Sequence, residues 1–424
     1  MAAASIRLGE APVGAARYLS PMTMTETTTV LNADEQRVTD LVDELLVSFP
    51  PASTEPKVFL GEQFDRGLAW VHFPEGHGGL GLNPKLQRTI NERAYAEGAP
   101  NPMYRNPIGH GMTGPTVVAW GSDEQKQRYL RPLFTGEEIW CQLFSEPGSG
   151  SDFAGLSSTG VEDGDEWIVN GQKVWTTLAH LSKWGLLVVR TDPNAVKHAG
   201  LTAFVVDMED PNVEIRPLRQ MTGEAEFNEV FFSDTRIPAT EMLGGAGDGW
   251  RVSLTTLMNE RVSIGGTIPQ RGSGTISALI QTWQQLPESS KDAASRDEVM
   301  KLWARAEVLR LTNIRANQNR KMGDPGPEGS IGKMASADLN KDIYDQVINL
   351  MGADGLLYGS YEMIRPETAM GSDTLQKAFL RSRANSIEGG TTEVMKNILG
   401  ERVLGLPGDI RVDRDRPWAE VPRS

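Results

Sequence analysis

Cysteine is almost absent from this chain, because Cys141 is the only one among its 424 residues. A single cysteine excludes an intramolecular disulfide and a metal site built from cysteines. The five histidines are scattered without the spacing of metal ligands, so we predict no metal site. Low cysteine content is typical of proteins from reducing compartments, and we expect a cytoplasmic protein.

Long apolar runs and an excess of positive charge are missing as well. No stretch approaches the roughly 18 consecutive apolar residues that a membrane-spanning helix needs. The formal net charge is -14 and the pI is about 5.0, whereas binding to nucleic acid or to an anionic membrane requires clustered Lys and Arg. We therefore expect no nucleic-acid partner and no membrane span.

The composition otherwise matches that of a folded protein. Hydrophobic residues make up 39% and charged residues 23% of the chain, close to the average of globular proteins. A chain of 424 residues exceeds what one hydrophobic core usually serves, so we expect two or three domains or one large layered domain. Residues 1–30 lack the apolar core of a signal peptide. We interpret them as a disordered extension, with a transit peptide as the alternative.

Helical periodicity marks the first third of the chain. Asn32 and Glu35 have the spacing of a capping box, and apolar residues follow them at helical intervals. Ser122 and Gln125 open further helical sequence. We therefore predict that this part of the chain is helical.

After Trp140 the pattern changes to short, strand-like runs. These runs occupy residues 167–169, 185–189, 202–207, 213–216 and 228–232. The pairs Asp163-Gly164 and Asn170-Gly171 flank the first run and are typical of tight hairpin turns. Short strands separated by turns predict an antiparallel sheet or barrel.

The helical period returns from Gly249 onward. Ser295 and Glu298 have the spacing of a further helix cap, and the Gly and Pro residues over 323–329 predict a loop. The order of helix, sheet and helix indicates the α+β fold class. The Arg-rich stretch after Leu406 has no packing period, and we expect it to be an exposed tail.

The chemically most informative segment is QLFSEPGSGSD at residues 142–152. A dinucleotide-binding fingerprint would need a third glycine where this chain has Phe153, and it would lie within a strand–helix–strand unit. Glycines and short hydroxyl side chains instead leave backbone N–H groups open to a ring edge or a phosphate. For the segment taken alone, a simple turn beside a sheet is the alternative.

Four other motifs follow this segment in order. They are NGQKVWTT at 170–177, NER at 259–261, MGADG at 351–355 and EGGTTEVMKNILGERVLGLP at 388–407. With these motifs in this order, the chain resembles the acyl-CoA dehydrogenase family over residues 33–407. The resemblance implies an N-terminal helical domain at 31–138, a middle antiparallel β-barrel at 139–243, a C-terminal four-helix bundle at 244–407 and a tail at 408–424.

The resemblance also implies noncovalently bound FAD between the barrel and the bundle. The matching cofactor residues are Gln142, Leu143, Phe144, Ser145, Ser151, Trp175, Thr176, Thr177, Asn349, Leu350, Met351, Gly352, Ala353, Thr391 and Glu393. Those from Asn349 to Ala353 are implied to serve the FAD of a neighbouring subunit in a homodimer or homotetramer. For Trp175, the alternative is a tryptophan in the core of the barrel.

The implied substrate is an acyl-CoA thioester. The matching substrate positions are Ser151, Met258, Asn259, Arg261, Gly389 and Gly390. Many relatives carry their catalytic Glu directly before a Gly-Thr pair, where this chain has Gly389. A subgroup places the base before an Arg on a bundle helix, and Glu260 matches that position. Glu388 is the alternative base.

Each candidate base also has a purely structural interpretation. Glu260 could form an ion pair near Arg261, and Glu388 could be a solvated charge in a loop. With either base, the predicted reaction is dehydrogenation of an acyl-CoA to the trans-2-enoyl-CoA, with electrons passing to an electron-transfer flavoprotein. The alternatives are an acyl-CoA oxidase on the same fold and a non-catalytic structural subunit of a heteromeric dehydrogenase.

Overall fold

The computed structural model describes residues 32–265, 268–321, 328–368, 374–408, 410, 412–413 and 415–421. The extension predicted at 1–30 and most of the loop predicted at 323–329 lie outside these residues. The described chain forms two compact units. The first holds residues 32–102 and 130–137, and the second holds 103–129 and 138–421.

The first unit is helical, as the sequence predicts. It contains α1 (Ala33–Ser48), α2 (Pro56–Asp65), the 3-10 turn η1 (Pro84–Leu86) and α3 (Gln87–Ala96). The capping box is confirmed, because Asn32 Oδ1 accepts the Glu35 N–H at 2.9 Å and the Glu35 carboxylate accepts the Asn32 N–H at 3.0 Å. The apolar stripe of α1 is buried at Val38, Val42 and Leu45.

The second unit begins with short helices. These are η3 (Gly109–Thr113), α4 (Gly114–Trp120) and the first part of α5 (Asp123–Thr135), whose residues from Leu130 on belong to the first unit. Ser122 and Gln125 form the expected reciprocal cap, because each side chain accepts the backbone N–H of the other residue, at 3.2 and 2.8 Å. Gln125 Nε2 also donates to the Thr240 carbonyl at 2.8 Å, which ties the start of α5 to the end of the sheet.

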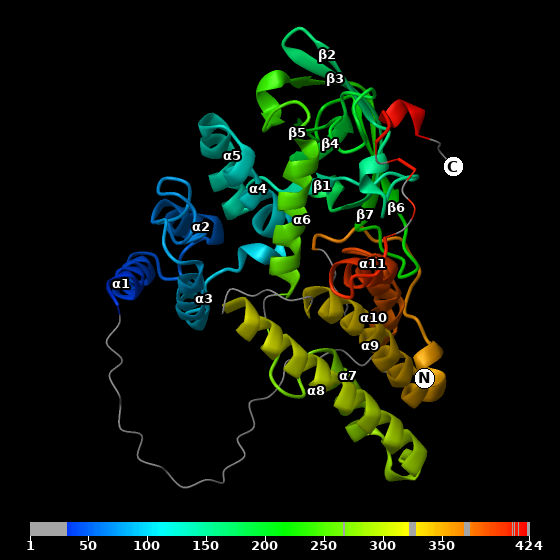
Figure 1. Ribbon diagram of the computed structural model, residues 1–424. Helices are drawn as coiled ribbons and strands as arrows, with labels where there is room; N and C mark the ends of the chain where they lie inside the picture. The colour runs from blue at the N-terminus through cyan, green and yellow to red at the C-terminus, as the bar shows by residue number, and fades with distance from the viewer. Residues whose placement is uncertain are drawn as a thin grey trace. The chain divides into compact units, whose positions relative to one another are not determined.

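An eight-stranded sheet follows in the second unit (Figure 1). Its strands are β1 (Trp140–Leu143), β2 (Thr159–Asp163), β3 (Glu166–Thr177), β4 (Trp184–Arg190), β5 (Leu201–Asp207), β6 (Val213–Leu218), β7 (Phe227–Pro238) and β8 (Met242–Leu243). Neighbouring strands follow the order β6-β7-β3-β2-β4-β5-β8, and β1 pairs with β4. Apolar side chains from both ends of this path, such as Val230 and Phe204, form one buried cluster.

Most strand pairs are antiparallel, as predicted, but β2 meets β4 in parallel at one position, and β1 and β4 are parallel. Parallel pairing needs a crossover connection, and here the β2–β3 hairpin lies between the two strands in sequence. The sheet is therefore mixed. The α+β fold class, with a helical part, a middle sheet and a second helical part, is confirmed.

One of the two predicted hairpin turns is wrong. Asp163-Gly164 does connect β2 to β3, whereas β3 runs without a turn through Asn170 and Gly171 with a break in its register. The Asn170 amide bonds the side chain and the backbone N–H of Asp234 on β7, both at 2.8 Å. The Asn-Gly pair thus forms a bulge, at which Gly171 has a φ of 151°.

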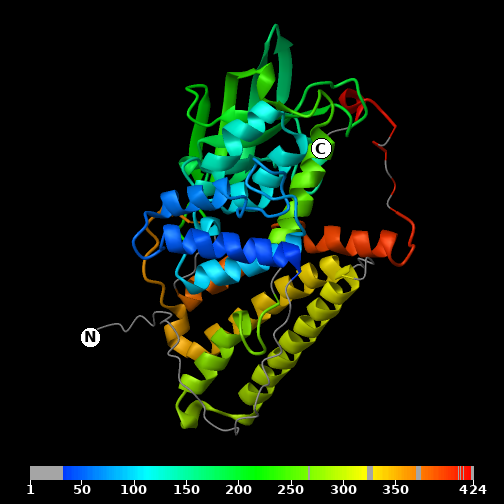
Figure 2. The ribbon, with the colours of Figure 1, turned by 90° about the vertical axis from the view of Figure 1, so that its left-hand side faces the viewer.

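The C-terminal part of the second unit is helical. It consists of α6 (Gly249–Gly265), α7 (Thr275–Gln285), α8 (Ala293–Lys321), α9 (Glu328–Met351), α10 (Leu375–Ser382) and α11 (Thr392–Arg402). The long helices α8 and α9 lie side by side in both views (Figure 1, Figure 2). Their contact buries Leu302, Leu339 and Ile343. Within the stretches that the structure describes, no helix is both long and apolar enough to cross a membrane.

Two further expectations about the C-terminal part are wrong. Helix α8 begins at Ala293 and not at Ser295, because Asp292 Oδ1 accepts the Ser295 N–H at 2.7 Å. The tail is not merely exposed, because the Trp418 side chain is only 7% exposed and packs on the guanidinium of Arg190. Such contacts involve single residues, so they leave no periodic pattern in the sequence.

We predict that Gly171→Ala destabilises the protein more than Gly164→Ala. A Cβ at Gly171 would lie 2.2 Å from Ser158 Oγ, whereas a Cβ at Gly164 would meet nothing within 4 Å. Overpacking at Gly171 costs about 1–3 kcal/mol, in addition to the strain that a side chain meets at the positive φ of either position. Thermal melts of the two variants measure the difference, and equal melting temperatures would contradict the bulge.

Candidate active site

The structure brings together the two segments predicted to border the flavin ring. Gln142 and Leu143 end β1, and Trp175 to Thr177 end β3. The Val174 N–H donates to the Ser145 carbonyl at 2.9 Å, so the two segments lie side by side. Their side-by-side position could not be read from the sequence, in which about thirty residues separate them.

A buried ion pair fastens these segments to each other. Lys173 and Glu146 have side chains that are 0% and 7% exposed, and Lys173 Nζ lies 2.8 Å from Glu146 Oε1. Lys173 Nζ also donates to the Phe144 carbonyl at 3.1 Å. The Glu146 carboxylate accepts the N–H groups of Ser157 and Ser158 at 2.6 and 3.0 Å. Both charges are therefore fully engaged, as buried charges must be.

The environment of this pair favours the charged carboxylate. Burial by itself opposes ionisation of Glu146, but the adjacent Lys173 ammonium outweighs burial and lowers the pKa of the carboxyl. At Lys173, burial has the opposite sign and lowers the pKa of the ammonium group. Neither residue can be recognised as one of a pair from the sequence, because a Lys or a Glu within a motif does not indicate its partner.

Trp175 leaves the strand ladder at a second irregularity of β3. The register of β3 against β7 shifts between Lys173 and Thr176, and Trp175 has a φ of 62°. Its indole is 59% exposed and meets the edge of the Phe227 ring. The alternative of a barrel-core tryptophan is therefore wrong. Left-handed geometry at a bulky residue is costly, and such strain clusters at functional sites.

These residues suit a flavin chemically. Thr176 is buried, and its hydroxyl has no hydrogen-bond partner within the described part of the chain. A Cβ at Gly148 or Gly150 would meet nothing within 4 Å, and Ser151 beside them is exposed. The exposed indole and the buried hydroxyl donor suit a planar flavin ring, and the open glycine loop suits a pyrophosphate. The residues present therefore fit FAD.

The other cofactor candidates lie on the helical side of the unit. Asn349, Gly352 and Ala353 are exposed around the C-terminal end of α9. No hydrogen bond between described residues joins them to the flavin segments of the same chain. Thr391 caps α11 by accepting the Val394 N–H at 3.1 Å, and its hydroxyl is thus partly committed to the helix.

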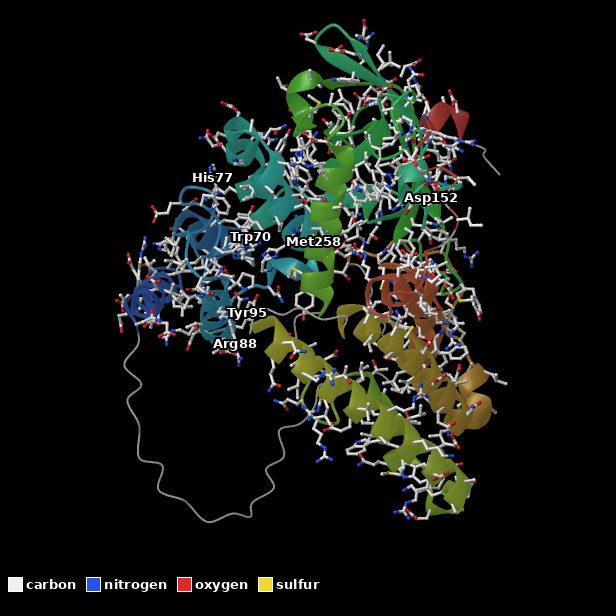
Figure 3. The ribbon with its side chains drawn as sticks, viewed as in Figure 1. Trp70, His77, Arg88, Tyr95, Asp152 and Met258 are labelled. Atoms are coloured by element: carbon white, nitrogen blue, oxygen red, sulfur yellow. The ribbon has the colours of Figure 1, made fainter. Side chains whose placement is uncertain are left out.

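Glu260 and Gly389 lie next to each other in the structure. Glu260 is on α6, and a Cβ at Gly389 would stand 3.4 Å from Glu260 Oε1. Glu260 matches the helix position of the base in some relatives, and Gly389 matches its loop position in others. The two positions are therefore neighbours in this structure. Met258 lies on the same helix, is exposed and is labelled in Figure 3. Asn259 donates to the Thr255 carbonyl at 2.9 Å, and the Arg261 side chain lies outside the described residues.

Glu388 has a different role from its neighbour Gly389. Its carboxylate accepts hydrogen bonds from Arg381 Nη2 at 2.7 Å and from Asn385 Nδ2 at 2.8 Å. The Arg381 Nε also lies 3.5 Å from Glu226 Oε1, just before Phe227 on β7. Glu388 is thus one end of an ion network that joins the sheet to α10, and its interpretation as a solvated loop charge is wrong.

Lys333 holds the loop that contains Gly389. From α9, its Nζ donates to the Asn385 carbonyl at 2.9 Å and to the Gly390 carbonyl. Gly389 and Gly390 have φ angles of 61° and 93°, which side chains disfavour. Burial lowers the pKa of Lys333, and nearby carboxylates, including Glu388 and Glu260, oppose that shift. No motif or spacing in the sequence points to this lysine.

Comparison with protein families gives three matches along the chain. The models are the acyl-CoA dehydrogenase N-terminal domain at residues 40–137, the middle domain at 141–235 and the C-terminal domain at 247–404. Acyl-CoA dehydrogenase IpdE1 of Mycobacterium tuberculosis is 35% identical over 347 residues, which cover 81% of this chain and 86% of that protein. The human mitochondrial short-chain specific acyl-CoA dehydrogenase is 25% identical and covers 80% of each chain.

Solved structures share the fold. The Tcur3481-Tcur3483 steroid ACAD aligns with a TM-score of 0.68 at 21% identity, covering 89% of this chain and 99% of that one. The ChsE4-ChsE5 complex from Mycobacterium tuberculosis aligns with a TM-score of 0.64 at 24% identity, covering 90% and 100%.

We call residues 142–146 and 173–177, together with Phe227, the flavin wall. The fold, the flavin wall and these matches define an FAD-dependent oxidoreductase. Its class is that of the flavoproteins that act in fatty-acid and lipid metabolism. The chain belongs to the acyl-CoA dehydrogenase family.

We predict that Glu146→Gln strongly destabilises the flavin wall. The change leaves the buried Lys173 ammonium without its counter-charge, which costs about 3–5 kcal/mol. The melting temperature and the FAD content of the purified protein should both fall. Glu162→Gln on exposed β2 is the matched control and should change neither quantity. An unchanged melting temperature in Glu146→Gln would show that the pair is not structurally required.

Proposed function

We propose that this chain dehydrogenates an acyl-CoA thioester to the trans-2-enoyl-CoA with Glu260 as the catalytic base. The observation that carries the proposal is the position of Glu260 Oε1, 3.4 Å from where a Cβ at Gly389 would stand. The Glu388 carboxylate accepts hydrogen bonds from Arg381 and Asn385. The position of Glu260 beside Gly389 supports Glu260 as the carboxylate that acts where many relatives carry their base.

Glu260 and Gly389 have separate roles in the proposed reaction. Glu260 removes the proton from the α carbon of the thioester. The Gly389 N–H donates to the thioester carbonyl and stabilises the negative charge that develops on its oxygen. Bound FAD supplies the acceptor for the hydrogen and the two electrons that leave the β carbon.

The flavin wall provides binding and shielding. Ser145, Ser151 and the Thr176 hydroxyl would offer hydrogen bonds to the bound cofactor, and Trp175 would help to exclude water from it. The exposed residues Asn349, Gly352 and Ala353 would reach the cofactor of a neighbouring subunit. We also propose the domain ranges 31–138, 139–243 and 244–407, which agree in order with the three family models.

We propose that an electron-transfer flavoprotein takes the electrons from the reduced enzyme. The buried Cys141, without a disulfide partner, fits a reducing cytoplasmic setting for this reaction. An oxidase would instead pass the electrons to oxygen. Rapid reoxidation of the reduced enzyme in air would favour the oxidase.

A heteromeric assembly is the second candidate. Two structural relatives carry the names of two different proteins, ChsE4-ChsE5 and Tcur3481-Tcur3483. In such an assembly the chain would complete the FAD site of a different subunit. Native mass and FAD content of the protein purified alone separate the candidates. A yellow homodimer or homotetramer supports the homomeric enzyme, and a colourless preparation supports the structural subunit.

We predict that Glu260→Gln retains FAD but loses activity. Without the carboxylate the α proton has no acceptor, so anaerobic addition of a good acyl-CoA should no longer bleach the flavin absorbance. The loss should be at least about 100-fold in rate. Glu388→Gln is the matched control and should still bleach. Full bleaching by Glu260→Gln, with loss in Glu388→Gln, would move the base to Glu388.

We predict that Lys333→Met lowers kcat by about 10- to 100-fold while FAD stays bound. The loop that presents the Gly389 N–H loses its two bonds to Lys333 Nζ, so the thioester carbonyl is less well stabilised. Lys341→Met, on the same helix but with its ammonium paired to Asp338, is the control. A change confined to KM would mean that Lys333 acts on binding alone.

A further inference from the structure

The C-terminal tail reaches the flavin segment of its own chain. We define the C-terminal strap as Asp413 together with residues 415–421. We propose that the strap fixes the far end of the glycine loop 148–152 and thereby strengthens FAD binding. The inference rests on the proposed assignment of residues 142–152 to the flavin. The strap lies beyond residue 404, where the match to the family's C-terminal domain ends.

An ion network links the strap to the loop through one lysine. Lys197 Nζ lies 2.6 Å from Asp152 Oδ2 and 2.5 Å from Asp413 Oδ2. The Lys197 side chain is only 8% exposed. Asp152 ends the glycine loop and is labelled in Figure 3 beside the tail. Burial by itself would lower the pKa of Lys197, but its two carboxylate partners outweigh burial and raise it.

A second contact joins the strap to the residues that follow the loop. The Trp418 ring packs on the Arg190 guanidinium, with the carbon 4.3 Å from the ring centroid. That guanidinium donates to the Ala154 carbonyl at 2.6 Å and to the Leu156 carbonyl at 3.3 Å. Arg190 is buried on β4. Trp418 thus covers the cation that holds the chain directly after Asp152.

Backbone bonds keep the strap in place. The Trp418 N–H donates to the Ala195 carbonyl and the Ala419 N–H to the Pro193 carbonyl, each at 2.9 Å. A further bridge pairs Pro417 with Val196. The strap is therefore docked as an extra segment on the β4–β5 connection, which also contains Lys197.

The loop needs a fixed point at each end. At its start, the pair of Glu146 with Lys173 anchors the chain, and at its end Asp152 and Ala154 are held by Lys197 and Arg190. Between them, a Cβ at Gly148 or Gly150 would meet nothing within 4 Å, and the backbone of Ser149 pairs with that of Glu146 by two hydrogen bonds of 3.0 Å. Ordering such a loop on a ligand costs conformational entropy, and a pre-ordered loop binds more tightly.

Trp418→Ala and Asp413→Asn test the strap without deleting it. Titration of the apoprotein with FAD should give a dissociation constant raised about 3- to 10-fold in each variant. Glu420→Gln, exposed on the same segment, is the matched control and should bind FAD as the wild type does. Hydrogen exchange of the apoprotein should rise in peptides over 148–156 but not in peptides over β5.

The two readouts separate the possible failures. Unchanged hydrogen exchange at 148–156 in both variants would overturn the strap. Faster exchange with unchanged FAD affinity would mean that the strap holds the loop but that the loop does not bind FAD, which would overturn the assignment under the proposed function. Faster exchange with weaker FAD binding supports both.

Discussion

The buried ion pair of Lys173 and Glu146 is the interaction on which the flavin wall depends. Burying either charge alone would be strongly destabilising. The two charges pair because residues 144–146, which follow β1, lie against β3. Lys173 stands two residues before Trp175, and Glu146 directly follows Ser145. The pair therefore sets the distance between two segments that the sequence keeps apart, and the register break at Trp175 then turns the indole outward.

A second charged network connects this wall to the helices. Arg381 lies between Glu226, next to Phe227 in the wall, and Glu388, next to Gly389 in the loop. Because Phe227 touches Trp175, one arginine links the flavin wall to the loop beside Glu260. Within the network, the Glu388 carboxylate is held by Arg381 and Asn385, which supports the proposal that Glu388 is structural.

Local patterns in the sequence predicted local structure well, but they did not predict contacts between residues that are far apart in the sequence. The cap at Asn32 and the turn at Gly164 need only neighbours along the chain. Gly171 has the same turn chemistry as Gly164, yet Asn170 bonds Asp234 across the sheet and the pair becomes a bulge. The motifs identified the candidate flavin segments, whereas Lys333, Arg381 and the docking of the tail depend on tertiary partners that no spacing reveals.

The convergence of Glu260 and Gly389 has a physical rationale. A loop residue at a φ of 61° is strained if it carries a side chain, and the space beside it already contains Glu260 Oε1. Glycine at 389 avoids the backbone strain. In the proposed reaction the proton acceptor would belong to helix α6, while Lys333 on α9 would hold the loop that carries the Gly389 N–H.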